Sequence, residues 1–280
     1  MARLNRRSTL AKCSLAAAAL ALAGCEASRP SEENEAAAAN NVAAPTPLPL
    51  PAPEPPLDRE RLLLAVAQAR SAYAAGADDR TAQAELDGDR FELRIRFGCG
   101  APPAEAAGNP SVRHDPEART VELSASPDLD LADPAVAAMA GEEVEAVEGI
   151  WLSRPWVLQP ACPPAAAAPA QAAEGEPPRQ LPRQIGIAQF FTPDDSRVGR
   201  RGNRSYRHVI RLDEGQDPAR AQGYDLVLSG RLRAGPAGRV IRCTGSNPDS
   251  MPSCLIGAEF EEVRFEDAER RAVIARWGRG

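Results

Sequence analysis

Alternation of apolar and polar residues constrains the fold of this chain more than any other feature. Phe91, Leu93, Ile95 and Phe97 are separated by one glutamate and two arginines. A period of two places four apolar side chains on one face of a half-buried strand. Further short apolar runs, separated by turn-forming residues, follow toward the C-terminus. The pattern predicts a mainly β body of about ten strands, arranged as an antiparallel sandwich or a barrel-like sheet.

Two hairpins are predicted near the start of this body. The tight-turn signal Asp87-Gly88 suggests that residues 82–86 pair with the strand at 91–97. A turn at 114–117 precedes Val121 and Leu123 and predicts a second hairpin. The remaining predicted strands are 143–152, 184–191, 205–212, 223–233, 238–243, 254–265 and 271–277.

Two helices are predicted beside the strands. Asp58 can cap a helix over residues 59–75 that Gly76 would end, with its apolar residues near one face. Asp133 followed by Pro134 predicts a shorter helix that runs to Ala140.

Two segments rich in alanine and proline divide the chain. Residues 25–57 have almost nothing to bury, so we expect a disordered tether after residue 24. Pro163–Pro182 predicts a linker inside the β body of residues 58–280. The body would then contain one domain, or two subdomains at 58–162 and 184–280.

The first 24 residues have the three parts of an export signal. Four basic residues precede an apolar run from Ser14 to Leu22, and small residues follow. The run is too short to span a membrane stably. Residues 5–10 also resemble a twin-arginine signal, with Thr9 in place of the usual aromatic residue; a plain basic start is the alternative.

The end of this signal, Leu22-Ala23-Gly24-Cys25, resembles the lipobox of bacterial lipoproteins. The resemblance covers these four residues and the signal, and it implies cleavage before Cys25 and acylation of that cysteine. Two or three acyl chains would anchor the protein firmly to a membrane. Glu26 stands where the family's inner-membrane retention signal has aspartate, so the resemblance favours the outer membrane, on its periplasmic side. The inner membrane is the alternative.

Four cysteines remain in the body, and export implies an oxidising compartment. We expect two disulfides. Of the three pairings, we favour Cys243 with Cys254, because the ten residues between them are rich in turn formers, and Cys99 with Cys162. Metal binding would need closely spaced cysteines or a nearby histidine, and the sequence has neither arrangement. No cofactor or metal is predicted.

The most unusual local chemistry is a cluster of arginines in an acidic chain. The net charge is −6, and loss of the signal would remove four more positive charges. This balance argues against nucleic-acid binding. The cluster is a candidate site for an anionic lipid or glycan, because guanidinium groups bind phosphate and carboxylate in a bidentate manner. The alternative is a solvated loop paired with local carboxylates such as Asp194 and Asp195. Its arginines are Arg197, Arg200, Arg201, Arg204 and Arg207.

Other candidate residues are better explained structurally. His114 and His208 could act as general bases, but no partner is visible in the sequence. The three tryptophans could stack on sugars, although a chain with 4% aromatic residues usually places them in its core. Asp128, Asp130 and Asp133 have calcium-like spacing without the glycine and closing glutamate of an EF-hand.

No catalytic motif is present. The sequence has no nucleophile elbow, phosphate-binding glycine loop or H-E-x-x-H motif. We therefore expect a lipid-anchored envelope protein that acts as a non-enzymatic binding or structural module. The alternative is an envelope or cell-wall hydrolase whose acid/base carboxylates come together only in the fold.

Overall fold

Ten strands and three helices make up the part of the chain described by a computed structural model. The described residues are 54–77, 79–103, 105, 108–163, 184–198, 200–220, 222–245, 247 and 249–278. They belong to one compact unit that begins at Pro53. The predicted signal, Cys25, nearly all of the tether and all of the predicted linker except Pro163 lie outside the described residues. No described helix is long and apolar enough to cross a membrane.

Seven strands form the larger sheet, which follows the order β1-β7-β9-β5-β4, with β8 and β10 also paired to β9. The sheet has open ends at β1 and β4, so the barrel alternative does not hold for the described strands. The strands are β1 (Arg90–Phe97), β4 (Ala146–Trp151), β5 (Ile185–Phe191), β7 (Tyr224–Leu232), β8 (Ile241–Thr244), β9 (Ser253–Asp267) and β10 (Val273–Gly278).

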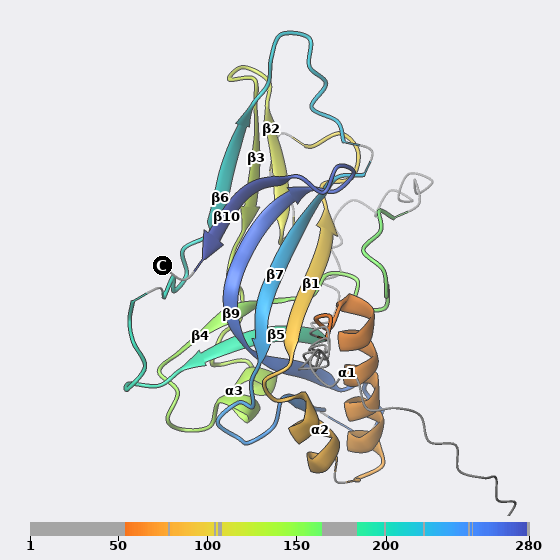
Figure 1. The fold of residues 1–280 in the computed structure, drawn as a ribbon, viewed down its shortest axis with the longest axis vertical. Coiled ribbons are helices and arrows are strands. Elements are labelled where there is room, and N and C mark those ends of the chain that lie inside the picture. Colours follow the sequence, from red (N-terminus) through yellow and green to blue (C-terminus); the bar gives the residue numbers. More distant parts are fainter. Residues whose placement is uncertain are drawn as a thin grey trace, which may run out of the picture. The chain divides into compact units, whose positions relative to one another are not determined.

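The long strand β9 organises this sheet, because four other strands pair with it (Figure 1). Its first part pairs with β5 and β8, and its second part pairs with β7 and β10. The pairing with β5 is parallel, an exception in a body whose other pairings between named strands are antiparallel, as predicted for most of it. Strand β5 pairs with β9 as far as Gly257, and β10 pairs with β9 from Glu262 onward. The two strands therefore pair with separate parts of β9, and residues 258–261 lie between these parts.

A smaller sheet packs over the second part of the larger one. It contains β2 (Ser111–Asp115), β3 (Thr120–Ala125) and β6 (Tyr206–Arg211), in the order β2-β3-β6. The hairpin of β2 and β3 confirms that prediction. Val121 and Leu123 are fully buried in the same core as Phe97 and Phe265, so the two sheets share one hydrophobic core. Both sheets contain strands from before and after residues 164–183.

Strand β1 shows why the period-two pattern predicted the body well. Phe91, Leu93, Ile95 and Phe97 are all buried, and they face the common core. The strand pairs with β7, more than 120 residues later in the chain, and not with residues 82–86. Leu57, the last residue of the predicted tether, also pairs with β1 through backbone hydrogen bonds.

Three helices cover the base of the larger sheet (Figure 1). Helix α1 (Arg59–Ala74) begins after Asp58, whose side chain accepts a hydrogen bond from Arg61 N. Helix α3 (Pro134–Ala140) has Asp133 as its N-cap, as predicted. Helix α2 (Arg80–Leu86) lies where we predicted a strand, so that prediction is wrong. The buried Gln83 of α2 accepts a hydrogen bond from Ile241 N, a tertiary contact that favours the helix.

Two disulfides crosslink the described chain. Cys99 bonds to Cys162 and Cys243 to Cys254, which confirms the predicted pairing. The second disulfide lies across the paired strands β8 and β9. The first ties the end of β1 to the segment that follows β4.

Candidate functional site

The arginine cluster lies in the connection between β5 and β6, residues 192–205, which we call the arginine loop. Residue 199 is outside the described residues. The loop leaves the larger sheet at Phe191 and enters the smaller sheet at Tyr206. It therefore connects the two sheets near residues 258–261 of β9, between the pairings with β5 and β10.

Arg200 is the structural centre of the loop. Its side chain is only 12% exposed, forms an ion pair with Glu145 and lies 4.6 Å from the ring centre of Phe191. It also donates hydrogen bonds to the backbone carbonyls of Thr192, Asp195 and Ser196 over 2.8 to 3.1 Å. With these partners, Arg200 has little remaining capacity to bind an anion.

Glu148 of β4 binds the backbone of the same loop. Its carboxylate is buried, and Oε1 accepts hydrogen bonds from the backbone N–H groups of Arg201 and Gly202 at 2.6 and 2.7 Å. Charge-assisted bonds of this kind are about twice as strong as neutral ones. Glu145 and Glu148 are the residues that sequence reasoning missed, because nothing in β4 marks them as partners of a loop more than 50 residues later.

Arg201 and Arg204 complete the loop and reach solvent. Arg201 lies 4.5 Å from the ring centre of Tyr206 and donates to Ser205 O at 3.1 Å. Arg204 donates from Nε and Nη2 to the carbonyls of Arg201 and Arg200. Neither guanidinium forms an ion pair with a carboxylate among the described residues.

The other two arginines of the cluster differ in environment. Arg207 lies on β6, outside the loop, and forms an ion pair with Glu122 at 3.0 Å. Arg197 is exposed, and its side chain has no hydrogen-bond or ion-pair partner within the described ranges. The alternative of arginines paired with carboxylates holds for Arg200 and Arg207, although their partners are Glu145 and Glu122.

A cleft of about 320 Å³ lies beside the loop, and we call it the arginine cleft. It brings together four arginines of the cluster and aromatic residues from different strands, among them a tyrosine of β6 and a tryptophan of β10. The four arginines and these two aromatic residues are Arg197, Arg200, Arg201, Arg204, Tyr206 and Trp277.

The acidic residues of the arginine cleft already have partners. Glu148 accepts the two loop amides, and Glu261 pairs with Arg231 at 3.4 Å. Glu262 pairs with Arg264 at 2.8 Å. Glu261 and Glu262 are paired with arginines outside the cleft, whereas Glu148 keeps its negative charge because its partners are neutral amides. Arg197, Arg201 and Arg204 have no ion-pair partner among the described residues, so the lining of the cleft has an excess of positive charge.

Tyr206 and Trp277 form the aromatic wall of the cleft. Their ring centres are 5.3 Å apart in an edge-to-face arrangement, and Trp277 packs in the same way on buried Phe265. Burial, together with the nearby charge of Glu148, raises the pKa of Tyr206 to about 12, although Arg201 opposes the shift. The tyrosine therefore remains neutral and can donate a hydrogen bond at neutral pH.

The other tryptophans lie away from the cleft. Trp151 is buried, as expected for a core residue, whereas Trp156 is 59% exposed, so the core expectation is wrong for Trp156. Neither lines the arginine cleft.

The remaining candidate residues have structural roles or no resolved partner. Asp128 accepts a hydrogen bond from Trp151 N, Asp130 from Ala132 N and Asp133 from Ala135 N. These bonds account for the acidic spacing that resembled a calcium loop. His114 lies on β2 and His208 on β6, and neither lines the cleft. Among the described residues, no group of three or more metal-ligating side chains comes together.

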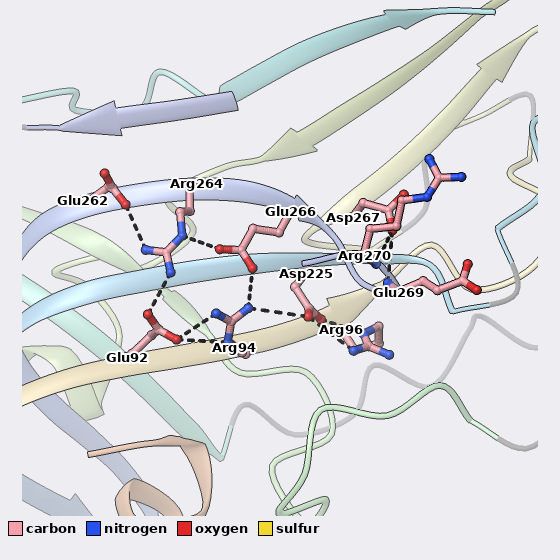
Figure 2. A network of polar contacts seen from close by, with 10 residues as sticks. All are labelled: Glu92, Arg94, Arg96, Asp225, Glu262, Arg264, Glu266, Asp267, Glu269 and Arg270. Carbon is pink, nitrogen blue, oxygen red and sulfur yellow. Dashed lines mark hydrogen bonds and ion pairs between the residues drawn. The ribbon is translucent and has the colours of Figure 1, made fainter. Parts of the chain in front are cut away.

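A second charged cluster lies on the polar face of β1, β7 and β9, and we call it the ion network (Figure 2). Arg96 binds both carboxylate oxygens of Asp225, which is fully buried, at 2.6 and 3.3 Å. Arg264 joins Glu92, Glu262 and Glu266 at 2.5 to 2.8 Å. Arg94 also contacts Glu92 and Glu266. The charges of this cluster are thus paired across three strands.

The electrostatics of the ion network favour a structural role. Burial alone would raise the pKa of Glu266, but hydrogen bonds and charge interactions with Arg94 and Arg264 outweigh it, and the pKa falls below its usual value. The same balance lowers the pKa of Glu92. A general acid needs a raised pKa, so these carboxylates are suited to ion pairing and not to proton donation.

Comparison with known proteins adds no functional assignment. No family model, no curated protein and no solved structure matches this chain. The functional argument therefore depends on the sequence and on the geometry of the arginine cleft.

Proposed function

We propose that this chain is a lipid-anchored protein of the bacterial cell envelope. The support is the export signal with its lipobox at residues 22–25 and the Pro-rich segment that follows. Two disulfides in the body suit the oxidising compartment that this route implies. The resemblance favours the outer membrane, with the body on the periplasmic side.

The anchor is tested by intact mass spectrometry of the full chain extracted from bacterial membranes. We expect a polypeptide that begins at Cys25, carries two or three acyl chains and has no free thiol. Replacement of Cys25 by serine should release the chain into the soluble periplasmic fraction. A wild-type chain that is recovered unacylated and soluble would overturn this part of the proposal.

The body acts as a non-enzymatic binding module for an anionic envelope component, which binds in the arginine cleft. One observation carries this proposal: Arg197, Arg201 and Arg204 border a cleft in which Glu261 and Glu262 are paired with other arginines, so three guanidinium groups face one remaining carboxylate, Glu148. Glu145 and Glu148 fix the loop before any ligand arrives. Such preorganisation lowers the entropy lost when a ligand binds.

A lipid phosphate or an acidic glycan has the chemistry that the cleft can recognise. Guanidinium groups bind phosphate and carboxylate oxygens, and an aromatic wall can pack against a sugar or glycerol unit. A neutral Tyr206 adds a hydrogen-bond donor. The hydrolase alternative gains no support from the resolved pKa shifts of the described carboxylates, Glu92 and Glu266, which are both downward.

The binding proposal is tested with a Cys25→Ser chain, so that the anchor cannot carry the protein onto lipid. Binding to phosphatidylglycerol vesicles and to lipopolysaccharide is compared between this chain and the same chain with Arg197→Ala and Arg204→Ala. A matched control removes two exposed arginines elsewhere, Arg61 and Arg90. We expect the cleft variant to lose at least tenfold in affinity for one of the probes, and the control variant to lose little. Equal binding by all three chains would overturn the proposal.

A further inference from the structure

A second hollow adjoins the arginine cleft, and we call it the apolar groove. Its volume is about 990 Å³, at the upper end of the range for small-molecule pockets. It lies between the first half of the arginine loop and the connection from β7 to β8. The apolar residues that line it are Phe190, Phe191, Val198, Ala234, Pro236 and Ala258.

The two hollows share a wall. Gln189, Phe191 and Val198 line both of them. Gln189 is buried, and its side-chain oxygen accepts a hydrogen bond from Phe260 N at the point where β5 leaves β9. Phe191 is buried on the sheet side and covered by the guanidinium of Arg200. These contacts fix the shared wall, so a ligand could occupy both hollows without displacing a strand.

Exposed apolar side chains line the groove. Val198 is 85% exposed, although the arginine loop to which it belongs is otherwise held by hydrogen bonds. Ala234 and Pro236 are also exposed, on the facing connection. An apolar concave surface of this size usually corresponds to a binding site.

The one cation that lines the apolar groove is paired within the described residues. Arg233 forms an ion pair with Glu259 at 3.1 Å, and Asp195 accepts hydrogen bonds from Thr192. No unpaired cation of the described residues therefore lies in the groove, whereas the adjoining cleft has three. This separation matches a ligand with one charged end and one apolar end.

We infer that the ligand of this site is an anionic amphiphile, whose phosphate or carboxylate head binds in the arginine cleft and whose aliphatic chain lies in the apolar groove. This inference depends on the proposed function and makes it more specific, because a free anion or a glycan would leave the apolar groove empty. Aliphatic chains gain free energy in proportion to the apolar area that they bury.

The test uses the Cys25→Ser chain and three probes, of which the two amphiphiles are kept below their critical micelle concentrations. Dodecyl phosphate has both the head and the chain, inorganic phosphate has the head alone, and dodecyl maltoside has the chain with a neutral head. Isothermal titration calorimetry gives the three dissociation constants. We expect dodecyl phosphate to bind at least tenfold more tightly than either other probe. A tenfold gain equals about 1.4 kcal/mol, which burial of two methylene groups would supply.

Variants separate the two hollows. Ala234→Trp fills the apolar groove from an exposed position, and Ala237→Trp on the same connection is the matched control outside its lining. Ala234→Trp should lower the affinity for dodecyl phosphate at least fivefold and leave the affinity for inorganic phosphate unchanged, whereas Ala237→Trp should change neither affinity. Arg197→Ala with Arg204→Ala should lower the affinity for both anions.

The outcomes distinguish this inference from the proposed function. If dodecyl phosphate binds no more tightly than inorganic phosphate, or if Ala234→Trp has no effect, the amphiphile inference is wrong and the anion site stands. If the arginine variant leaves both anions unaffected, the anion site is wrong as well. Equal binding of dodecyl maltoside and dodecyl phosphate would indicate an apolar site without charge selectivity, and would also overturn the inference.

Discussion

Removal of the Asp225 carboxylate should strongly destabilise the body, because this group neutralises a buried cation. Asp225 is fully buried on β7, and both of its oxygens bind Arg96, whose side chain is 7% exposed. In Asp225→Ala, Arg96 would remain buried without its partner and close to Arg94. Breaking a buried pair in this way costs about 3 to 5 kcal/mol.

The assay is thermal and urea unfolding of the Cys25→Ser chain with its disulfides intact. For domains of 150 to 250 residues each kcal/mol shifts the melting temperature by about 2 to 4 °C, so the expected loss is about 10 °C. Glu261→Ala is the matched control on β9, because its ion pair with Arg231 is 44% to 47% exposed. An exposed pair contributes at most about 1 kcal/mol.

A double variant separates pairing from simple packing. Asp225→Leu combined with Arg96→Met removes both charges and keeps apolar volume, so it should recover most of the stability lost in Asp225→Ala. The reasoning would be refuted if Asp225→Ala cost no more than Glu261→Ala. It would also be refuted if the double variant were as unstable as the single one.

Three further predictions follow from the same structure. Because the pKa of Glu266 lies below its usual value of 4.5 in the folded chain, its contribution to stability is present above that pH and is lost as the pH falls below it; Glu266→Gln should flatten this decline in a pH series of urea midpoints. Loss of the Cys99–Cys162 disulfide, which spans 63 residues, should lower the free energy of unfolding by about 4 kcal/mol. Loss of Cys243–Cys254, which spans 11, should lower it by about 3 kcal/mol, and the reverse order of urea midpoints would contradict this. Glu148→Ala removes the acceptor of two loop amides, so limited trypsin digestion should cut the arginine loop faster, and an unchanged rate would mean that Glu148 does not hold it.

The strands were largely predictable because each carries its own burial pattern. The alternation in β1 and the β2–β3 hairpin could be recognised from neighbouring residues alone. Helix α2 could not, because its buried Gln83 bonds to β8, more than 150 residues later. The parallel pairing of β5 with β9 was also invisible, since nothing in either strand specifies the direction of its neighbour.

The site was predictable in composition but not in geometry. The sequence identified the arginine cluster, but it did not indicate that the Arg200 side chain is bonded within the loop, while the Arg197 side chain has no partner among the described residues. That difference depends on Glu145, which directly precedes β4, on Glu148 within β4, and on Phe191. The apolar groove was not predicted, because its walls come from two connections that are adjacent only in the fold.

The most direct test of the arginine cleft as a binding site uses the three tryptophans as reporters. Trp277 lines the cleft, whereas Trp151 is buried elsewhere and Trp156 is exposed outside it. Indole N–H resonances of the ¹⁵N-labelled Cys25→Ser chain are followed while a short-chain phosphatidylglycerol is added below its critical micelle concentration. The account predicts a saturable shift of Trp277 alone, which is lost in Arg197→Ala with Arg204→Ala. No shift of Trp277, or a shift that persists in the arginine variant, would contradict it.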